Sequence, residues 1–304
     1  MLLQIFLLFL VGTLCYAQQS EQPTLCLTFD DGSVDNMPGY SSEQWNKMLL
    51  ERLHEAKVQA IFFVKGKAVD NEKGRMVLQT WDEAGHLIAN HTYSHWFFNS
   101  KNLTLHDFIV DVLKNDSLIK GYSHYTKLFR FPYLKEGNTT EKRDGFRRFL
   151  KEQNYRNGYV TIDASDWYVN SRLLNKLKAD STADITPYRD YYLQHIYDRA
   201  LYYNDLAKKL TGRQIKHSLL LHHNPAAALF MGDLIAMFKA KGWKVVNASE
   251  AYSDEIYNNQ PDILPAGESL IWAMAKESGK FENVLRYPAE DGNYQKAEMD
   301  SLDL

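Results

Sequence analysis

Reactive side chains follow five short apolar runs of the chain, at the point where each run ends. The groups are Asp30-Asp31-Gly32, His91-Thr92-Tyr93-Ser94-His95, Arg130-Phe131-Pro132-Tyr133, Asp163-Ala164-Ser165-Asp166-Trp167 and His222-His223. Each group alone has an ordinary explanation, because Asp-Asp-Gly is typical of a turn and two histidines four residues apart are often unrelated surface residues. Their shared position indicates function, since residues that follow the strands of a βα barrel meet at one face.

Asp31, His91 and His95 could together hold a divalent metal. Two neutral imidazoles and one carboxylate make a three-ligand set that leaves coordination positions open for water and substrate. A structural zinc site would need a fourth protein ligand, so this set is typical of catalysis. We expect zinc, with cobalt, nickel or manganese as alternatives, because sites of nitrogen and oxygen donors accept several divalent ions.

A general base is expected beside this metal. Thr92 occupies the position at which the zincin motif has its glutamate, so the base must come from elsewhere in the chain. Asp30 is adjacent to the ligand Asp31. It can therefore accept a proton from water whose pKa the ion lowers toward about 7.

Short apolar runs alternate with amphipathic stretches from residue 24 onward, which is typical of strands separated by helices around a parallel sheet. The predicted strands cover residues 24–29, 58–64, 86–90, 127–131, 159–162, 218–221 and 243–246. The predicted helices cover residues 41–56, 75–84, 105–120, 140–153 and 227–240. About seven βα units close more easily as a barrel than they remain as an open sheet, so we predict a single α/β barrel domain over residues 18–258.

Two segments depart from this alternation. Residues 168–213 form a long insertion before the last motif, rich in tyrosine and expected to be helical. The insertion could shape a substrate groove or form a helix pair packed on the core, and we favour the helix pair. Residues 259–304 contain Pro261, Pro265 and Pro288 and end in polar residues, so we predict an irregular extension packed on the barrel.

The first seventeen residues predict export. Residues 2–14 are almost wholly apolar and end at Cys15-Tyr16-Ala17, which is typical of a signal peptide. The stretch is too short to span a bilayer and no later segment could do so, hence we expect a periplasmic or secreted protein without a transmembrane segment. Removal of the peptide leaves Cys26 as the only cysteine, which excludes an internal disulfide.

The composition argues against nucleic acid and is compatible with sugar. The net charge of −3 shows no excess of the positive charge that is typical of nucleic-acid-binding proteins. The chain has 6 Trp and 19 Tyr, whose flat rings with a polar edge suit the faces of sugars, although most such rings fill cores. No pattern in the sequence predicts a protein partner.

Taken in order, the five groups resemble the motifs of polysaccharide deacetylases, the NodB-homology group or carbohydrate esterase family 4. The resemblance spans residues 24 to about 248, with Leu220-Leu221-His222 as the fifth motif. It implies a distorted (β/α)7 barrel. It also implies that Asp30 is the general base and His222 the general acid, and that Asp31, His91 and His95 are the metal ligands.

The resemblance implies two residues that orient the acid and the base. Arg130 would orient Asp30, and Asp166 would orient His222 and keep it charged. His223 stands where the family often has an acidic residue, which leaves His223 as an alternative acid.

The resemblance further implies a pocket for the acetyl group. Leu220 and Trp167 would form its walls, and the backbone N–H of Tyr133 would stabilise the oxyanion, a contribution of about 3 kcal/mol for one such donor. Leu134 follows Tyr133 where the family's third motif usually has glycine. The edge of the groove beside Tyr133 is therefore expected to differ from that of family members.

The function predicted from these residues is removal of N-acetyl groups from amino sugars of a polysaccharide or oligosaccharide, such as peptidoglycan or a chitin-like glycan. One alternative is an esterase that uses the same catalytic residues and metal to remove O-acetyl groups from glycans such as xylan. The other is a barrel that only binds polysaccharide. Binding alone would require neither Asp30 nor His222, which favours an enzyme.

Overall fold

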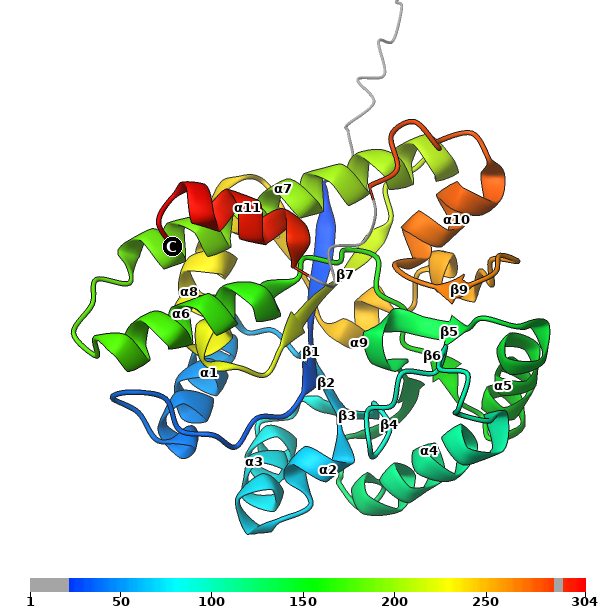
Figure 1. The fold of residues 1–304 in the computed structure, drawn as a ribbon, viewed down its shortest axis with the longest axis horizontal. Helices are drawn as coiled ribbons and strands as arrows, with labels where there is room; N and C mark the ends of the chain where they lie inside the picture. The colour runs from blue at the N-terminus through cyan, green and yellow to red at the C-terminus, as the bar shows by residue number, and fades with distance from the viewer. Residues whose placement is uncertain (1–21, 287–291) are drawn as a thin grey trace, which may run out of the picture.

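A curled sheet of parallel strands forms the centre of the protein (Figure 1). The computed structural model describes residues 22–286 and 292–304. The central strand β1 (Thr24–Asp31) pairs with β2 (Ile61–Val64) on one edge and with β7 (Lys216–His222) on the other, while β8 (Lys244–Val245) pairs with its first residues. Six of the eight β1 residues are buried, because helices cover the sheet on its outer face.

The sheet curls round until its two ends almost meet. Beyond β2 it continues through β3 (Leu87–Asn90), β4 (Tyr125–Phe129) and β6 (Arg156–Asn157). After β6 the chain reaches the other end of the sheet, where Ile162 forms an isolated parallel bridge with Leu219 of β7. The predicted strand at 159–162 is thus reduced to this one bridge, and closure by a single bridge makes the barrel distorted. The predicted α/β barrel is confirmed.

The predicted helices are also present, each beginning and ending within a turn of its prediction. They are α1 (Ser42–Ala56), α3 (Glu72–Glu83), α4 (Leu105–Ile119), α5 (Thr140–Glu152) and α8 (Pro225–Ala240). Short polar side chains cap each first turn; Ser41 with Gln44, and Thr104 with Asp107, form complete capping boxes. Four short helical elements before residue 259 were not predicted: α2 (Gly66–Val69), α9 (Ala248–Ala251) and the 3₁₀ turns η1 (Pro132–Leu134) and η2 (Glu255–Asn258).

The long insertion is a helix pair that packs on the core, as we favoured. It consists of α6 (Asp166–Ala179) and α7 (Thr186–Thr211). Tyr188, Tyr192 and Tyr203 of α7 are buried in the main core, so these tyrosines serve packing and not a groove. The N-terminus of α6, in contrast, carries Asp166 and Trp167 to the sheet edge where the motifs gather.

The C-terminal extension is more regular than predicted. It adds β9 (Ala266–Gly267), which pairs antiparallel with β5 (Lys135–Gly137), and the helices α10 (Leu270–Ser278) and α11 (Asn293–Ser301). Pro261 and Pro265 lie before these helices, and Ser269 caps α10 just after them. Leu270 and Ile271 are buried against the main core.

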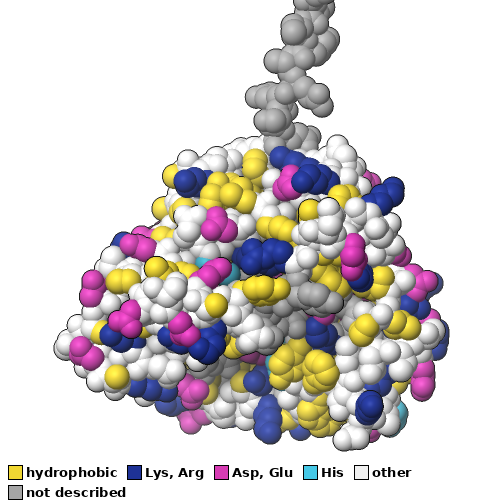
Figure 2. Space-filling model, turned by 45° about the horizontal axis from the view of Figure 1, so that its top comes forward, with side chains coloured by type: hydrophobic (Ala, Val, Ile, Leu, Met, Phe, Trp, Pro, Cys, Tyr) yellow, Lys and Arg dark blue, Asp and Glu magenta, His cyan; other side chains and the backbone are white. Residues whose placement is uncertain are grey.

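Several expectations concern the surface or the N-terminus. Within residues 22–286 and 292–304, no helix combines the length and apolar character needed to cross a bilayer. Positive and negative side chains are interspersed over the described part of the face drawn in Figure 2. The predicted signal peptide, residues 1–17, lies outside the described residues.

Candidate active site

Asp30 and Asp31 end the central strand at the carboxyl edge of the sheet. Asp30 is buried, while Asp31 has φ 76° and begins a sharp turn that continues through Gly32 at φ 118°. A Cβ atom on Gly32 would lie 2.9 Å from a Val69 methyl carbon, so both the backbone angle and the space require glycine. The turn holds the Asp31 carboxylate at the mouth of the barrel.

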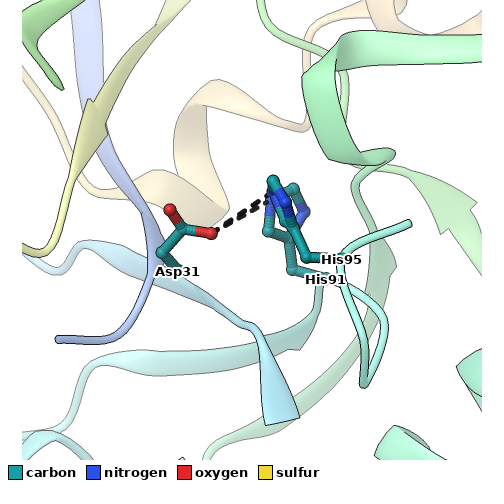
Figure 3. A group of neighbouring side chains, drawn as sticks. All are labelled: Asp31, His91 and His95. Atoms are coloured by element: carbon teal, nitrogen blue, oxygen red, sulfur yellow. Dashed lines mark ion pairs between the residues drawn. The ribbon is translucent and has the colours of Figure 1, made fainter. Parts of the chain in front are cut away.

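His91 and His95 face Asp31 from the loop after β3, and the three side chains point toward one another (Figure 3). The Nε2 atoms of His95 and His91 lie 3.3 and 3.9 Å from Asp31 Oδ1. One ligand atom from each residue falls within 4.8 Å of the others. The sequence prediction that these three side chains come together is therefore met by the geometry.

The donor set fits a divalent cation. Asp31 Oδ1 is buried and has no hydrogen-bond partner among the described residues, an arrangement that costs free energy unless a cation or donor occupies the space. Burial lowers the pKa of His95 to about 4 and that of His91 well below its usual value, so both imidazoles are neutral. His91 Nδ1 lies 2.9 Å from the carbonyl oxygen of Arg130 and donates to it, which leaves Nε2 as a lone-pair donor toward Asp31.

The loop that carries the two histidines is held by a residue that the sequence analysis missed. Asp111 of α4 accepts hydrogen bonds from the backbone N–H groups of Tyr93 (3.0 Å) and Ser94 (2.8 Å). His95 has a left-handed backbone, φ 58°, and its N–H donates to the Thr92 hydroxyl. These bonds fix a conformation that non-glycine residues adopt only when surroundings hold them in it.

Arg130 follows β4 and forms a buried ion pair with Asp30, with 2.5 Å between Nη1 and Oδ1. The guanidinium also donates to Thr28 and to the Tyr252 hydroxyl, both at 2.9 Å, and it stacks on the Phe63 ring. Burial raises the pKa of Asp30 to about 6, although Arg130 acts to lower it. Asp30 is thus an oriented carboxylate that can exchange a proton near neutral pH.

His222, at the end of β7, lies across the cavity and is held by Asp166. His222 Nδ1 lies 2.6 Å from Asp166 Oδ1, and the backbone N–H of His222 donates to Oδ2 at 3.0 Å. Burial lowers the pKa of His222, but fully buried Asp166 outweighs this effect and raises it to about 9. His222 is therefore an imidazolium at neutral pH, with Nε2–H as its remaining donor.

His223, the alternative acid, lies in the core. Its ring packs against Trp45, Phe62 and Trp81, and its Nε2 pairs with Asn46 at 2.9 Å. Burial lowers the pKa of His223 to about 3. The side chain does not line the cavity that holds Asp30, which favours His222 over His223 as the acid.

Eight of the ten predicted site residues line one cavity of about 370 Å³. They are Asp30, Asp31, His91, His95, Tyr133, Trp167, Leu220 and His222. The other two, Arg130 and Asp166, lie behind the cavity wall in contact with Asp30 and His222. Leu220 packs with Leu134 and Val160 in a small apolar cluster, which gives the cavity an apolar wall suited to a methyl group.

A family model described as polysaccharide deacetylase matches residues 17–149. Over these residues the chain resembles the polysaccharide deacetylase family. It is 27% identical over 144 residues to a peptidoglycan-N-acetylglucosamine deacetylase of Bacillus cereus, over 47% of this chain and 46% of the relative. The chain thus spans about half the length of that curated relative.

Solved structures share the fold of this chain. It resembles a polysaccharide deacetylase from Bacillus cereus (TM-score 0.53, 20% identity, covering 74% of this chain and 92% of that one). It also resembles a chitin deacetylase from the fungus Colletotrichum lindemuthianum (0.52, 21%, 77% and 89%). A pseudoenzyme of carbohydrate esterase family 4 from Bacillus anthracis is similar as well (0.53, 18%, 76% and 66%). At these identities the likeness establishes the fold alone, so activity has to be argued from the residues.

The cavity also contains two ionisable residues to which the sequence analysis gave no role. Lys65 directly follows β2 and lines the cavity, and its charge contributes to lowering the pKa of Asp31. The rule that identified the other groups, a polar residue at a strand end, would have found it. Asp163 lies in the fourth motif and lines the same cavity.

Proposed function

We propose that the protein is a metal-dependent hydrolase that removes N-acetyl groups from the amino sugars of a polysaccharide. The observation that carries this proposal is the placement of a carboxylate and an imidazolium in one cavity with the cluster of Asp31, His91 and His95. Burial raises the pKa of Asp30 to about 6, while burial lowers that of His222 but Asp166 outweighs this effect and raises it to about 9. Two groups with pKa values moved apart by their surroundings are typical of an acid and base pair.

Asp31, His91 and His95 would hold the metal, for which zinc is our first proposal and cobalt, nickel or manganese are alternatives. When bound, such an ion polarises the acetyl carbonyl and lowers the pKa of a nearby water molecule. The remaining chemistry falls to residues of this chain.

Asp30 would act as general base and accept the proton of the attacking water. Its ion pair with Arg130 fixes the orientation of the carboxylate. The Tyr133 backbone, at φ 56°, would present its N–H to the developing oxyanion. A single fixed donor of this kind stabilises the transition state by about 3 kcal/mol.

His222 would act as general acid and protonate the departing amine, for which it must carry a proton. Asp166 keeps it charged and oriented. Leu220 and Trp167 would bound the space for the acetyl methyl group, with Leu134 closing the lip. The amine leaves as a neutral group, and the carboxylate product is acetate.

The substrate that we propose is peptidoglycan or a chitin-like glycan. Support comes from the substrates named for the relatives, peptidoglycan N-acetylglucosamine in one and chitin in the other. We further propose that residues 1–17 direct export to the periplasm or the outside, and that residues 18–258 form the catalytic domain with 259–304 packed on it.

The test is acetate release from chitooligosaccharides, peptidoglycan fragments and acetylated xylan by purified protein supplied with Zn²⁺ or Co²⁺. We expect acetate and free amine in equal amounts from the first two substrates, and loss of both when a chelator is added. Release from xylan alone would assign the O-acetyl esterase function. No release from any of the three would contradict a hydrolase and leave a binding protein.

A further inference from the structure

Three large aromatic side chains are exposed beside the catalytic cavity. Trp96 is 44% exposed, Phe97 45% and Tyr133 48%. Isolated exposed apolar residues are ordinary on protein surfaces, but neighbouring ones form a patch, and such patches mark binding surfaces.

The rings form a continuous series that leads outward from the metal-ligand cluster. The ring centroids of His95 and Tyr133 are 4.6 Å apart, and those of Tyr133 and Phe97 are 5.7 Å apart. Trp96 and Phe97 then line a second cavity of about 420 Å³. The patch is therefore continuous with the site where the acetyl group would be cleaved.

The segment that carries Trp96 and Phe97 is fixed in place, so the exposure of these rings is a property of the fold. Phe98 is fully buried and stacks on Phe108 with centroids 4.1 Å apart. Lys142 donates to the carbonyl oxygens of Phe98 (2.9 Å) and Ser100 (2.7 Å). Because the buried Phe98 ring anchors this segment to the core, the segment is held without burial of the Trp96 and Phe97 rings. A surface that is ordered before binding loses less conformational entropy when a ligand arrives.

The chemistry of the second cavity suits a sugar. Ser100, Asn102 and Asp107 line it together with the two rings and Leu103. A pyranose has apolar C–H faces and a rim of hydroxyl groups, so rings interleaved with hydrogen-bonding side chains match it. A lipid tail has no groups that could form hydrogen bonds with these polar side chains.

We propose that Trp96, Phe97 and Tyr133 form an aromatic platform that binds the glycan at least one sugar unit beyond the unit being deacetylated. This inference rests on the proposed function and adds that the enzyme selects long chains over short ones. The three side chains of the platform raise affinity for substrates long enough to reach them and contribute nothing to the chemical step.

The test compares chitooligosaccharides of two and six sugar units. In the metal-loaded protein, we expect Trp96→Ala/Phe97→Ala to reduce the ratio of kcat/KM for six units to that for two units by about 10-fold, because two ring contacts are lost. The loss should appear in KM for six units, with kcat changed less than about 2-fold. Trp96→Phe and Phe97→Tyr keep a ring and should restore most of the ratio.

Two controls separate the platform from a structural effect. The variant must keep the metal content of the parent, since Trp96 is adjacent to His95. Tyr294→Ala removes an exposed ring from α11, which lines neither cavity, and should leave the ratio unchanged. An unchanged ratio in the double variant with normal metal content would overturn the platform.

Binding without turnover distinguishes this inference from the proposed function. In an Asp30→Asn background, we expect the double substitution to raise the Kd for the six-unit oligosaccharide about 10-fold, measured by calorimetry. If this holds while no acetate is ever released, the platform stands and the hydrolase proposal fails. If the double substitution instead changes only vesicle binding or self-association, the patch serves a membrane or protein partner and the platform is overturned.

Discussion

Asp30 and Asp31 are consecutive carboxylates whose surroundings move their pKa values in opposite directions. Burial raises the pKa of Asp30 to about 6. Burial also acts to raise that of Asp31, but His95, His222 and His91 outweigh it and lower the pKa to about 2. Asp31 therefore stays ionised as a cation ligand should, while Asp30 can take up and release a proton near neutral pH.

Asp30→Asn should separate these two roles. The substitution removes the proposed proton acceptor but leaves the three proposed metal ligands, so we expect kcat to fall by about 100-fold to 10,000-fold with metal content unchanged. Acetate release and metal analysis on the same preparation would check this. A variant with kcat close to that of the parent would exclude Asp30 as the base.

The proton on His222 should set the alkaline limit of activity. Because Asp166 outweighs the effect of burial and raises the pKa of His222 to about 9, and because the charged form is the proposed acid, kcat/KM should fall as the pH rises through about 9. Asp166→Asn removes the charge that raises this pKa, so the falling limb should move to lower pH. pH–rate profiles of parent and variant measure the shift, and coincident limbs would show that Asp166 does not control His222.

At the scale of elements, the C-terminal extension supports the turn that carries Tyr133. Tyr133 and Leu134 both have left-handed backbones, with φ of 56° and 55°, and such angles persist in non-glycine residues only when neighbours hold them. The β5–β9 pair does so: the N–H of Glu268 donates to the Leu134 carbonyl at 2.8 Å. Lys135 and Glu268 add an ion pair beside it.

Gly267→Ala should therefore disturb both stability and catalysis. A Cβ atom there would lie 2.0 Å from the Leu134 carbonyl oxygen, and the residue has φ 123°. We expect a loss of about 2 kcal/mol or more in the free energy of unfolding, and a lower kcat because the turn must shift.

Gly279→Ala is the matched control. Gly279 ends α10 at φ 66° with no atom within 4 Å of an added Cβ, so only the backbone cost of about 1 kcal/mol applies. Denaturant unfolding and kcat of both variants make the comparison. Equal effects on kcat would show that β9 does not position the catalytic turn.

Helix α7 offers a test of its role as a core element. Tyr192 is fully buried, and its hydroxyl has no hydrogen-bond partner among the described residues. Tyr192→Phe removes an unsatisfied polar group and should leave the free energy of unfolding unchanged or higher, whereas Tyr192→Ala should cost about 3–5 kcal/mol. Urea unfolding distinguishes them. A large loss in the Phe variant would mean that the hydroxyl has a partner, such as a water molecule.

The sequence predicts the strands, the helices and the residues of the candidate site better than it predicts the residues that hold the site residues in position. Apolar runs located β1, β2, β3, β4 and β7, because strands buried on both faces are nearly continuous in apolar residues. The supporting residues could not be predicted. Tyr252 contacts Arg130 across 122 positions and Asp111 contacts the histidine loop from a helix, and no local pattern encodes such contacts. The helices of the extension were missed because prolines nearby suggested irregular chain.

At the scale of the whole molecule, the site joins segments that are far apart in the sequence. Asp31 ends β1, the two histidines follow β3, Arg130 follows β4, and Asp166 ties α6 to β7 through His222. A cation bound to the cluster would link the end of β1 to the loop after β3 only in the folded state. Folding and metal binding should therefore be coupled.

Removal of the metal should lower the melting temperature. A ligand that binds only the folded state at a free concentration 100 times its Kd stabilises by about 2.7 kcal/mol, which corresponds to a rise of roughly 5–10 °C for a domain of this size. Thermal unfolding with excess chelator, and then with Zn²⁺ restored, measures the difference. His95→Ala removes one ligand and should abolish most of the shift. His124→Ala, which removes a histidine paired with Asp82 away from the cluster, should retain it. Equal melting temperatures with and without metal would show that the three side chains hold no ion, because a ligand that stabilises the folded state must raise its unfolding free energy whether or not the enzyme turns over.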